Sequence, residues 1–158
     1  MLKPEWTNPP DVYTPQAHYS QVARAGNTLY ISGQLGLDLD GELVGPGDAR
    51  AQARRAWRNV VAILEHYGAT PRQLVKTTTF ITHPAYRPLV ADARDEVFTE
   101  PPFPPSTLVV VQSLASRVEH TEETDWCTQV LGWDFRQKGQ RGTHCSVVCR
   151  VRYCFSYT

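Results

Sequence analysis

The sequence predicts an α+β or α/β fold in which two helices cover one face of a mixed sheet. Three observations support this fold class. Two short strand-like runs flank a turn pair near residue 26, a helical period of apolar residues lies between residues 48 and 68, and two later strand-like runs enclose a second helical pattern. The expected order is two or three strands, helix, strand, helix, strand, within the single domain that 158 residues allow.

The composition argues against several functional classes. Hydrophobic residues make up 41% of the chain and charged residues 20%, as in ordinary globular proteins. The formal net charge is +0, from 16 basic and 16 acidic residues, so no overall field would steer the chain to nucleic acid. No stretch approaches the roughly 20 apolar residues of a membrane span, and the first residues lack the apolar segment of a secretory leader. We expect a cytoplasmic protein that binds neither membrane nor nucleic acid.

Residues 1–18 are predicted to be an extended lead-in segment. They contain Pro4, Pro9, Pro10 and Pro15, which favour extended backbone and exclude a helix. We therefore expect this segment to deliver the chain to Tyr19 without forming an element of the core.

Residues 19–36 combine two short strands, a turn and a polar step. Apolar runs at 22–25 and 29–31 flank Gly26-Asn27, a pair that supplies the positive φ of a tight turn, so the pattern predicts an edge hairpin. The second strand ends at Ser32-Gly33-Gln34. A glycine there allows close approach of the backbone to a ligand, and the hydroxyl and amide of its neighbours lie on the same side of a strand. The strand end is a candidate binding site.

The clearest helix begins at Asp48, a plausible N-cap, and ends before Gly68, a plausible C′ residue. Arginines lie opposite its apolar stripe, on a face that we interpret as solvated. The stripe consists of Ala53, Ala56, Trp57, Val60, Ile63 and Leu64.

Three further elements follow. Residues 74–82, LVKTTTFIT, alternate β-branched and other residues and predict a strand with one buried face. Pro84 opens a second helix, which Pro101-Pro102 stops. Residues 106–114, STLVVVQSL, are apolar enough to predict a central strand.

The helix-free face of such a sheet should be covered by another subunit. The strands at 74–82 and 106–114 are apolar or threonine-rich on both faces, whereas two helices can cover only one face. A contiguous apolar surface of that size is unusual on a soluble monomer. We therefore expect a cyclic homo-oligomer with its sheet faces inward.

Several blocks in order resemble the RidA family, also called YjgF/YER057c/UK114. The blocks HYSQ, LYISGQLG, AQARRAWRNVVAILEHYGAT, LVKTTTFIT and PPFPPSTLVV carry the resemblance over residues 19–111. The resemblance implies a chorismate-mutase-like α+β fold, a homotrimer with ligand clefts between subunits, and hydrolysis of reactive enamines and imines to a keto acid and ammonia. We expect neither a cofactor nor a metal.

Some functional positions of the family match this sequence, and others differ. Tyr19 matches the tyrosine of the family's G-P-Y motif, and Ser32-Gly33-Gln34 matches its T-S-G-Q strand end. Active members have an arginine in F-P-A-R-S that holds the substrate carboxylate, and Ser106 occupies that position here. The implied catalytic residues are Tyr19, Ser32 and Gly33, and the implied substrate-binding residues are Gln34, Phe103, Ser106 and Thr107.

The missing arginine marks a divergent subgroup and opens an alternative function. A charge-assisted hydrogen bond contributes about 1.5 to 3 kcal/mol, so its loss weakens the binding of amino-acid-derived substrates by roughly one to two decades. The alternative is a non-catalytic trimer that binds small metabolites or proteins through the same cleft. RNA cleavage, attributed to some relatives, gains no support from the neutral charge.

Residues 117–158 differ in composition from the RidA-like domain at 19–116. They are rich in Cys, Trp, Arg and His, and nothing after Leu114 resembles the family's V-E-I-E-A strand, whose glutamate positions water. One hypothesis is translation from another frame or an altered gene end; the other is a true extension with a replacement strand at 146–155. The cysteines lack the paired spacings of zinc sites and are expected to be reduced; they are Cys127, Cys145, Cys149 and Cys154.

Overall fold

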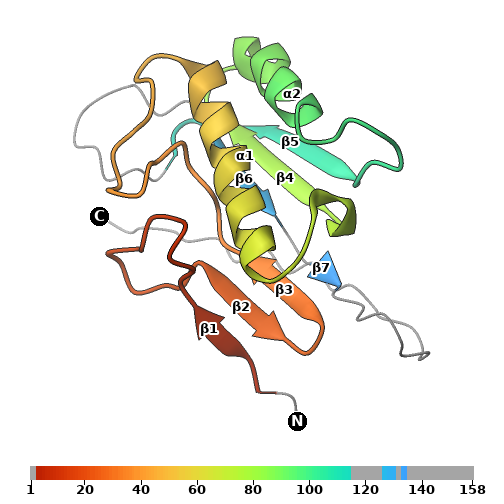
Figure 1. The fold of residues 1–158 in the computed structure, drawn as a ribbon. Coiled ribbons are helices and arrows are strands. Elements are labelled where there is room, and N and C mark those ends of the chain that lie inside the picture. The colour runs from red at the N-terminus through yellow and green to blue at the C-terminus, as the bar shows by residue number, and fades with distance from the viewer. Residues whose placement is uncertain (1–2, 115–125, 131–132, 135–158) are drawn as a thin grey trace.

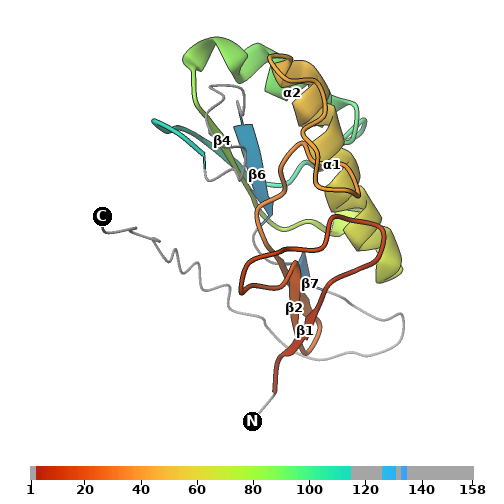
Figure 2. The same cartoon turned by 90° about the vertical axis from the view of Figure 1, so that its left-hand side faces the viewer.

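Two helices lie side by side on one face of the β-strands, and within the described residues the opposite face of the strands carries no helix (Figures 1 and 2). The computed structural model describes residues 3–114, 126–130 and 133–134. The strands form a four-stranded sheet of order β1-β2-β3-β7 and a three-stranded sheet of order β5-β4-β6. This arrangement confirms the predicted α+β class.

The predicted hairpin is present as β2, Val22–Ala25, and β3, Thr28–Ile31. The strands are antiparallel with Ala25 opposite Thr28, and Gly26 in the connecting turn has φ of 60°. Only a residue without a Cβ adopts this conformation at little cost, which explains why the turn falls there. The hairpin does not lie at the edge as predicted, because β1, Glu5–Thr7, pairs with β2.

The segment before the hairpin contributes to the core, so the prediction of a lead-in without a core element is wrong. Its residues Glu5–Thr7 form β1, and Val12 is buried in the main apolar cluster. The prolines correctly exclude a helix, but extended backbone is also what an edge strand requires.

Helix α1, Ala49–His66, begins and ends at the predicted caps. The Asp48 carboxylate accepts hydrogen bonds from the backbone N–H groups of Arg50 and Ala51, both at 3.0 Å. Gly68 has φ of 69°, the left-handed conformation that commonly ends a helix. The apolar stripe of α1 is buried throughout: Ala53, Ala56, Trp57, Val60, Ile63 and Leu64.

The second helical region consists of a 3₁₀ turn, Pro84–Tyr86, and helix α2, Arg87–Asp95. Val90 and Ala93 of α2 are buried against the core. Ion pairs join the two helices on their outer side, among them Arg50 with Asp92 at 2.7 Å. None of the described helices has the length and apolar composition needed to cross a bilayer.

Strand β4, Thr77–Ile81, lies between β5, Ser106–Val110, which is parallel to it, and β6, Trp126–Val130, which is antiparallel. A short 3₁₀ turn, Pro71–Gln73, precedes β4, which is why this strand begins three residues later than predicted. Its side chains alternate between buried and half-buried positions, as the sequence pattern predicts.

Strand β5 lies at the edge of its sheet within the described part of the chain, so the prediction of a central strand is wrong for the single chain. All five residues are exposed, including Leu108 and Val110. An apolar run indicates burial, but it does not indicate whether the same chain or another one provides the cover.

Two strands of the described part of the chain lie beyond Leu114. They are β6 and β7, Trp133–Asp134, which pairs with β3. The sequence WCTQV of β6 contains no carboxylate. The predicted replacement strand at 146–155, with Cys145, Cys149 and Cys154, lies outside the described residues.

Exposed aromatic side chains lie on the helix-free face of the hairpin sheet. Leu29 and Ile31 are buried toward the helices, so Tyr30 between them points to the other face and is 49% exposed. Tyr30 is opposite Ala23, which in turn is opposite Trp6 on β1. Cross-strand neighbours share a face, so these three residues form a row across three strands.

Replacing Thr77 by valine is expected to raise the free energy of unfolding by about 1 kcal/mol. Thr77 is 1% exposed, and no described group lies within hydrogen-bonding reach of its Oγ1 atom. Valine has nearly the same shape and removes an unsatisfied hydroxyl. Urea denaturation of both proteins checks this, with Thr78→Val on the opposite face as the matched control; an equal or lower stability of Thr77→Val would contradict it.

Candidate functional site

A buried pair of amide side chains organises the polar strand end of β3. The Oε1 atom of Gln21 accepts hydrogen bonds from Ser32 Oγ and from Gln34 Nε2, each at 2.7 Å. Gln21 Nε2 donates to the carbonyl oxygen of Tyr13 at 2.9 Å, and the Gln21 backbone N–H donates to Asn8 Oδ1 at 2.9 Å. The predicted site residues therefore contact a glutamine that the sequence reasoning missed.

The network places Ser32 and Gly33 near the surface and Gln34 beneath them. Gln34 is 2% exposed, and its Nε2 also donates to the Ser32 carbonyl oxygen at 3.1 Å. The Ser32 backbone N–H donates to the Gln21 carbonyl oxygen at 2.8 Å, which extends the hairpin ladder by one residue pair. Ser32 is half-buried and Gly33 is exposed. The amide nitrogen of Gln34 thus has a structural role, and its contact with a substrate stays a prediction.

Tyr19 reaches the surface two residues before Gln21. Its side chain is 52% exposed, and its backbone N–H donates to the Ala17 carbonyl oxygen at 2.8 Å. Because Gln21 is held by Asn8 and Tyr13, the segment that carries Tyr19 is tied to the same network as Ser32. The structure therefore connects two of the three predicted catalytic positions through Gln21.

The remaining predicted residues form a second group at and just before the beginning of β5, which belongs to the other sheet (Figure 1). Phe103 is 59% exposed, and Ser106 and Thr107 are exposed at the beginning of β5. Thr107 Oγ1 accepts a hydrogen bond from Lys76 Nζ, a cationic neighbour that the sequence reasoning missed. Strands β4 and β6 separate β5 from the hairpin sheet, so one chain alone does not bring Ser106 and Ser32 into a common pocket.

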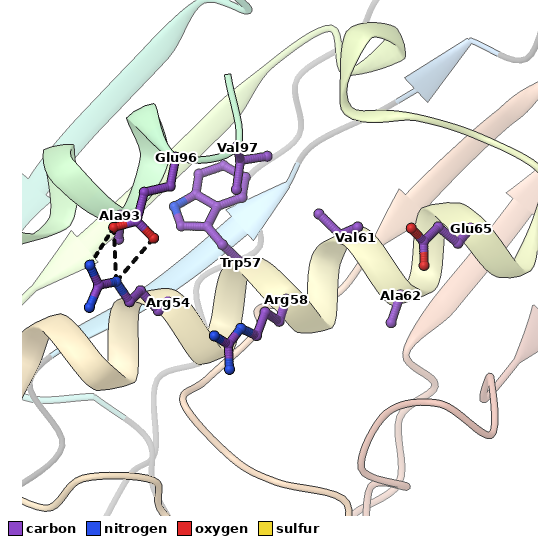
Figure 3. A pocket seen from close by; sticks show the side chains of 9 residues that line it. All are labelled: Arg54, Trp57, Arg58, Val61, Ala62, Glu65, Ala93, Glu96 and Val97. Carbon is purple, nitrogen blue, oxygen red and sulfur yellow. Dashed lines mark hydrogen bonds and ion pairs between the residues drawn. The ribbon is translucent and has the colours of Figure 1, made fainter. Parts of the chain in front are cut away.

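A groove of about 410 Å³ lies between α1 and α2, on the side away from the strands (Figure 3). The Arg54 guanidinium bridges it, with Nε at 2.9 and 3.0 Å from the two Glu96 carboxylate oxygens. The hydrogen bonds and the charge of Arg54 lower the pKa of Glu96 from its ordinary value. None of the predicted site residues lines this groove, whose lining consists of Arg54, Trp57, Arg58, Val61, Ala62, Glu65, Ala93, Glu96 and Val97.

No set of three or more His, Cys, Asp or Glu side chains with metal-binding geometry is present within residues 3–114, 126–130 and 133–134. The groups that the predicted site residues and their neighbours offer are hydroxyl, amide and backbone groups and the Lys76 ammonium. Such groups orient a small polar ligand and stabilise charge that develops on it.

Comparison with known proteins decides the family. The model of the family described as Endoribonuclease L-PSP matches residues 10–120, which is most of the chain. The chain belongs to the RidA family of L-PSP proteins. The match includes the hairpin, both helices, β4 and β5, and it begins nine residues before Tyr19.

Individual relatives agree with this family membership. The 2-iminobutanoate/2-iminopropanoate deaminase of Dermatophagoides farinae is 36% identical over 107 residues, which are 66% of this chain and 83% of that protein. The mouse protein of the same name is 42% identical over 64 residues, only 47% of its length. The Rid-family protein YyfA of Yersinia pestis has a TM-score of 0.74 at 27% identity, with 84% of this chain and 99% of that chain covered. RidA of an Antarctic Psychrobacter has a TM-score of 0.72 at 24% identity over 83% of this chain and 99% of that chain, which supports the fold alone.

Proposed function

We propose that this RidA-family protein hydrolyses reactive 2-imino acids, and the enamines that interconvert with them, to a keto acid and ammonia. The observation that carries the proposal is the Gln21 network, which holds the Ser32 hydroxyl and Gly33 at the surface beside the Tyr19 segment. Relatives named 2-iminobutanoate/2-iminopropanoate deaminase support the reaction class. In the reaction a protonated imine, C=NH₂⁺, takes up one water and becomes C=O, and ammonium leaves.

The mechanism that these residues support is attack of water on the protonated imine carbon. The Gly33 backbone and the hydroxyls of Tyr19, Ser32, Ser106 and Thr107 hold the substrate in position for this attack. Fixing the reactants in orientation replaces a large part of the entropy cost of a bimolecular step. The reaction needs no cofactor, and we place it in the cytoplasm.

We further propose that the complete cleft forms between the subunits of a homotrimer. Ser32 and Ser106 lie in different sheets of one chain, so a neighbouring chain is needed to bring the two groups together. The helix-free face carries Trp6 and Tyr30, and β5 leaves Val109 exposed. Apolar surface of this kind is typical of a subunit interface. Light scattering is expected to give the mass of three chains, and the mass of a single chain would overturn this proposal.

Hydrolysis of 2-aminoacrylate and 2-iminobutanoate, generated in situ from serine and threonine, tests the function directly. The native protein is expected to accelerate both reactions. Ser106→Arg is expected to raise kcat/KM by about tenfold to a hundredfold, since it restores a charge-assisted hydrogen bond to the substrate carboxylate. Ser113→Arg, at another exposed serine, is the matched control and should leave the rate unchanged.

Ser106 also favours a second function, namely a trimer that binds small metabolites or proteins without catalysis. The chain lacks two groups that the family resemblance implies for catalysis. Ser106 replaces the arginine that holds the substrate carboxylate, and β6 contains no carboxylate. Activity in Ser106→Arg but not in the native protein would indicate an inherited pocket with another ligand. Inactivity of both proteins would favour binding alone.

A further inference from the structure

The hydrogen-bond partners of Gln21 determine whether the Ser32 hydroxyl donates or accepts in its bond to Gln21. The carbonyl oxygens of Tyr13 and Ser32 can only accept hydrogen bonds, so the atoms bonded to them must be the amide nitrogens of Gln21 and Gln34 respectively. The orientation of both side-chain amides is thereby fixed. The atom of Gln21 that faces Ser32 is therefore its Oε1 oxygen, which cannot donate.

It follows that Ser32 Oγ must donate its single proton to Gln21. The Oγ–Oε1 distance of 2.7 Å is normal for such a bond, and Oε1 takes a second hydrogen bond from Gln34 Nε2 at the same distance. A serine hydroxyl has one proton and two lone pairs. Ser32 is half-buried, so only its lone pairs remain for a ligand at the surface, and they can bind only a group that donates.

We propose that Gln21 is a positioning residue that makes Ser32 select ligands with an N–H group at the reacting carbon over ligands with a carbonyl oxygen there. This inference rests on the proposed function and deepens it. Substrate and product of imine hydrolysis differ at this atom alone, because =NH₂⁺ donates hydrogen bonds whereas =O only accepts them. Ser32 therefore holds the imine, and its lone pairs repel the keto acid, which favours release of the product.

The N-terminal segment is fastened to the site through Gln21. Asn8 and Tyr13 both bind Gln21, and Tyr13 fixes the direction of the Gln21 amide. The Tyr13 carbonyl oxygen and the Gln34 amide nitrogen together keep the Gln21 oxygen toward Ser32, because a flipped amide would face an acceptor with its oxygen and a donor with its nitrogen. The segment at residues 8–13 thus helps to determine how a hydroxyl about twenty residues further along the chain forms its hydrogen bonds.

Binding measurements on the native protein test the preference of Ser32 for donor ligands without requiring catalysis. NMR titration is made with 2-aminobutanoate, which has N–H donors at C2, and with 2-oxobutanoate, which has a carbonyl oxygen there. The native protein is expected to bind the amino ligand about tenfold more tightly than the keto ligand, which is the effect of one hydrogen bond. Equal binding of the two ligands, tighter binding of the keto ligand, or binding of neither would overturn the inference.

Substitutions of Gln21 show whether it orients the Ser32 hydroxyl or is needed only for folding. Gln21→Met keeps the length of the side chain but removes the acceptor, so Ser32 can donate and the tenfold preference should disappear. Gln21→Glu loses the donor to Tyr13 but turns an acceptor oxygen toward Ser32 in either orientation, so a folded Gln21→Glu should retain the preference. Circular dichroism shows whether each variant is folded. Should Gln21→Met prove unfolded, Ser32→Ala provides the same test, since it also should remove the preference; retention in a folded Ser32→Ala would overturn the inference.

A double-mutant cycle and the hydrolysis assay distinguish failure of this inference from failure of the proposed function. In the Ser32→Ala background, Gln21→Met should change the amino-to-keto ratio no further, because no hydroxyl remains to reorient. Hydrolysis without any ligand preference would leave the proposed function standing and overturn the inference. A preference that depends on Gln21, in a protein without hydrolase activity, would support the inference and overturn the function.

Discussion

Replacing Trp57 by alanine is expected to lower the free energy of unfolding by about 3–5 kcal/mol. Trp57 is 1% exposed, lies in the middle of the α1 stripe and packs edge-to-face on Phe98 with ring centroids 5.4 Å apart. Alanine leaves a cavity between the two helices and the sheet. For a protein of this length the loss corresponds to a fall in Tm of roughly 10 °C or more, measurable by calorimetry or urea denaturation.

Trp57→Phe is the matched control. It keeps an aromatic ring against Phe98 and removes Nε1, a buried nitrogen without a hydrogen-bond partner in the described part of the chain. Losing an unsatisfied donor offsets part of the lost volume, so we expect a loss below about 1.5 kcal/mol. A loss under 1 kcal/mol in Trp57→Ala itself would mean that the interhelical core does not depend on this residue.

The elements that the sequence predicted well are those specified by local chemistry. The β2–β3 hairpin follows from a turn pair that only a few residue types form, and its two-residue loop sets the register. Helix α1 follows from the Asp48 cap, the apolar period and the glycine after Tyr67. Each signal acts within a few residues, so no knowledge of distant contacts is needed.

The elements that the sequence predicted poorly depend on contacts between distant residues. An apolar run such as LVVV in β5 indicates that the strand is covered, yet in one chain the strand is exposed at an edge. The prolines of the first residues predict a segment outside the core, although Val12 is buried there. In both cases burial depends on which surface comes to lie alongside, and no local pattern contains that information.

The site was predicted in part. Ser32 and Gln34 were found because they surround a glycine at a strand end, whereas Gln21 was missed because its partners lie in two other segments, residues 8–13 and 32–34. A signal was available. Counting back from the two-residue turn places Gln21 directly opposite Ser32, one pair beyond Val22 and Ile31. Two polar residues facing each other at the end of an apolar ladder indicate a polar contact.

Replacing Gly36 by alanine is expected to lower the free energy of unfolding by about 3 kcal/mol, because helix α1 leaves no room for a side chain there. An added Cβ would lie 2.8 Å from the Cα atom and 3.0 Å from the carbonyl oxygen of Gln52. These are backbone atoms in the first turns of α1, so relief requires the helix or the Gly36 loop to move. Urea denaturation measures the loss.

Gly68→Ala is the control that separates this steric effect from the conformational cost of replacing a glycine. Gly68 has φ of +69°, but an added Cβ would meet nothing within 4 Å, so only the conformational cost of about 1 kcal/mol applies. Gly36→Ala should also shift the side-chain amide signals of Gln34, two residues away, whereas Gly68→Ala should not. If the two variants lose equal stability and the Gln34 signals stay in place, the close approach of α1 does not hold the strand end in position. If they differ as expected, the packing of Gly36 on α1 supports the same network that orients the Ser32 hydroxyl.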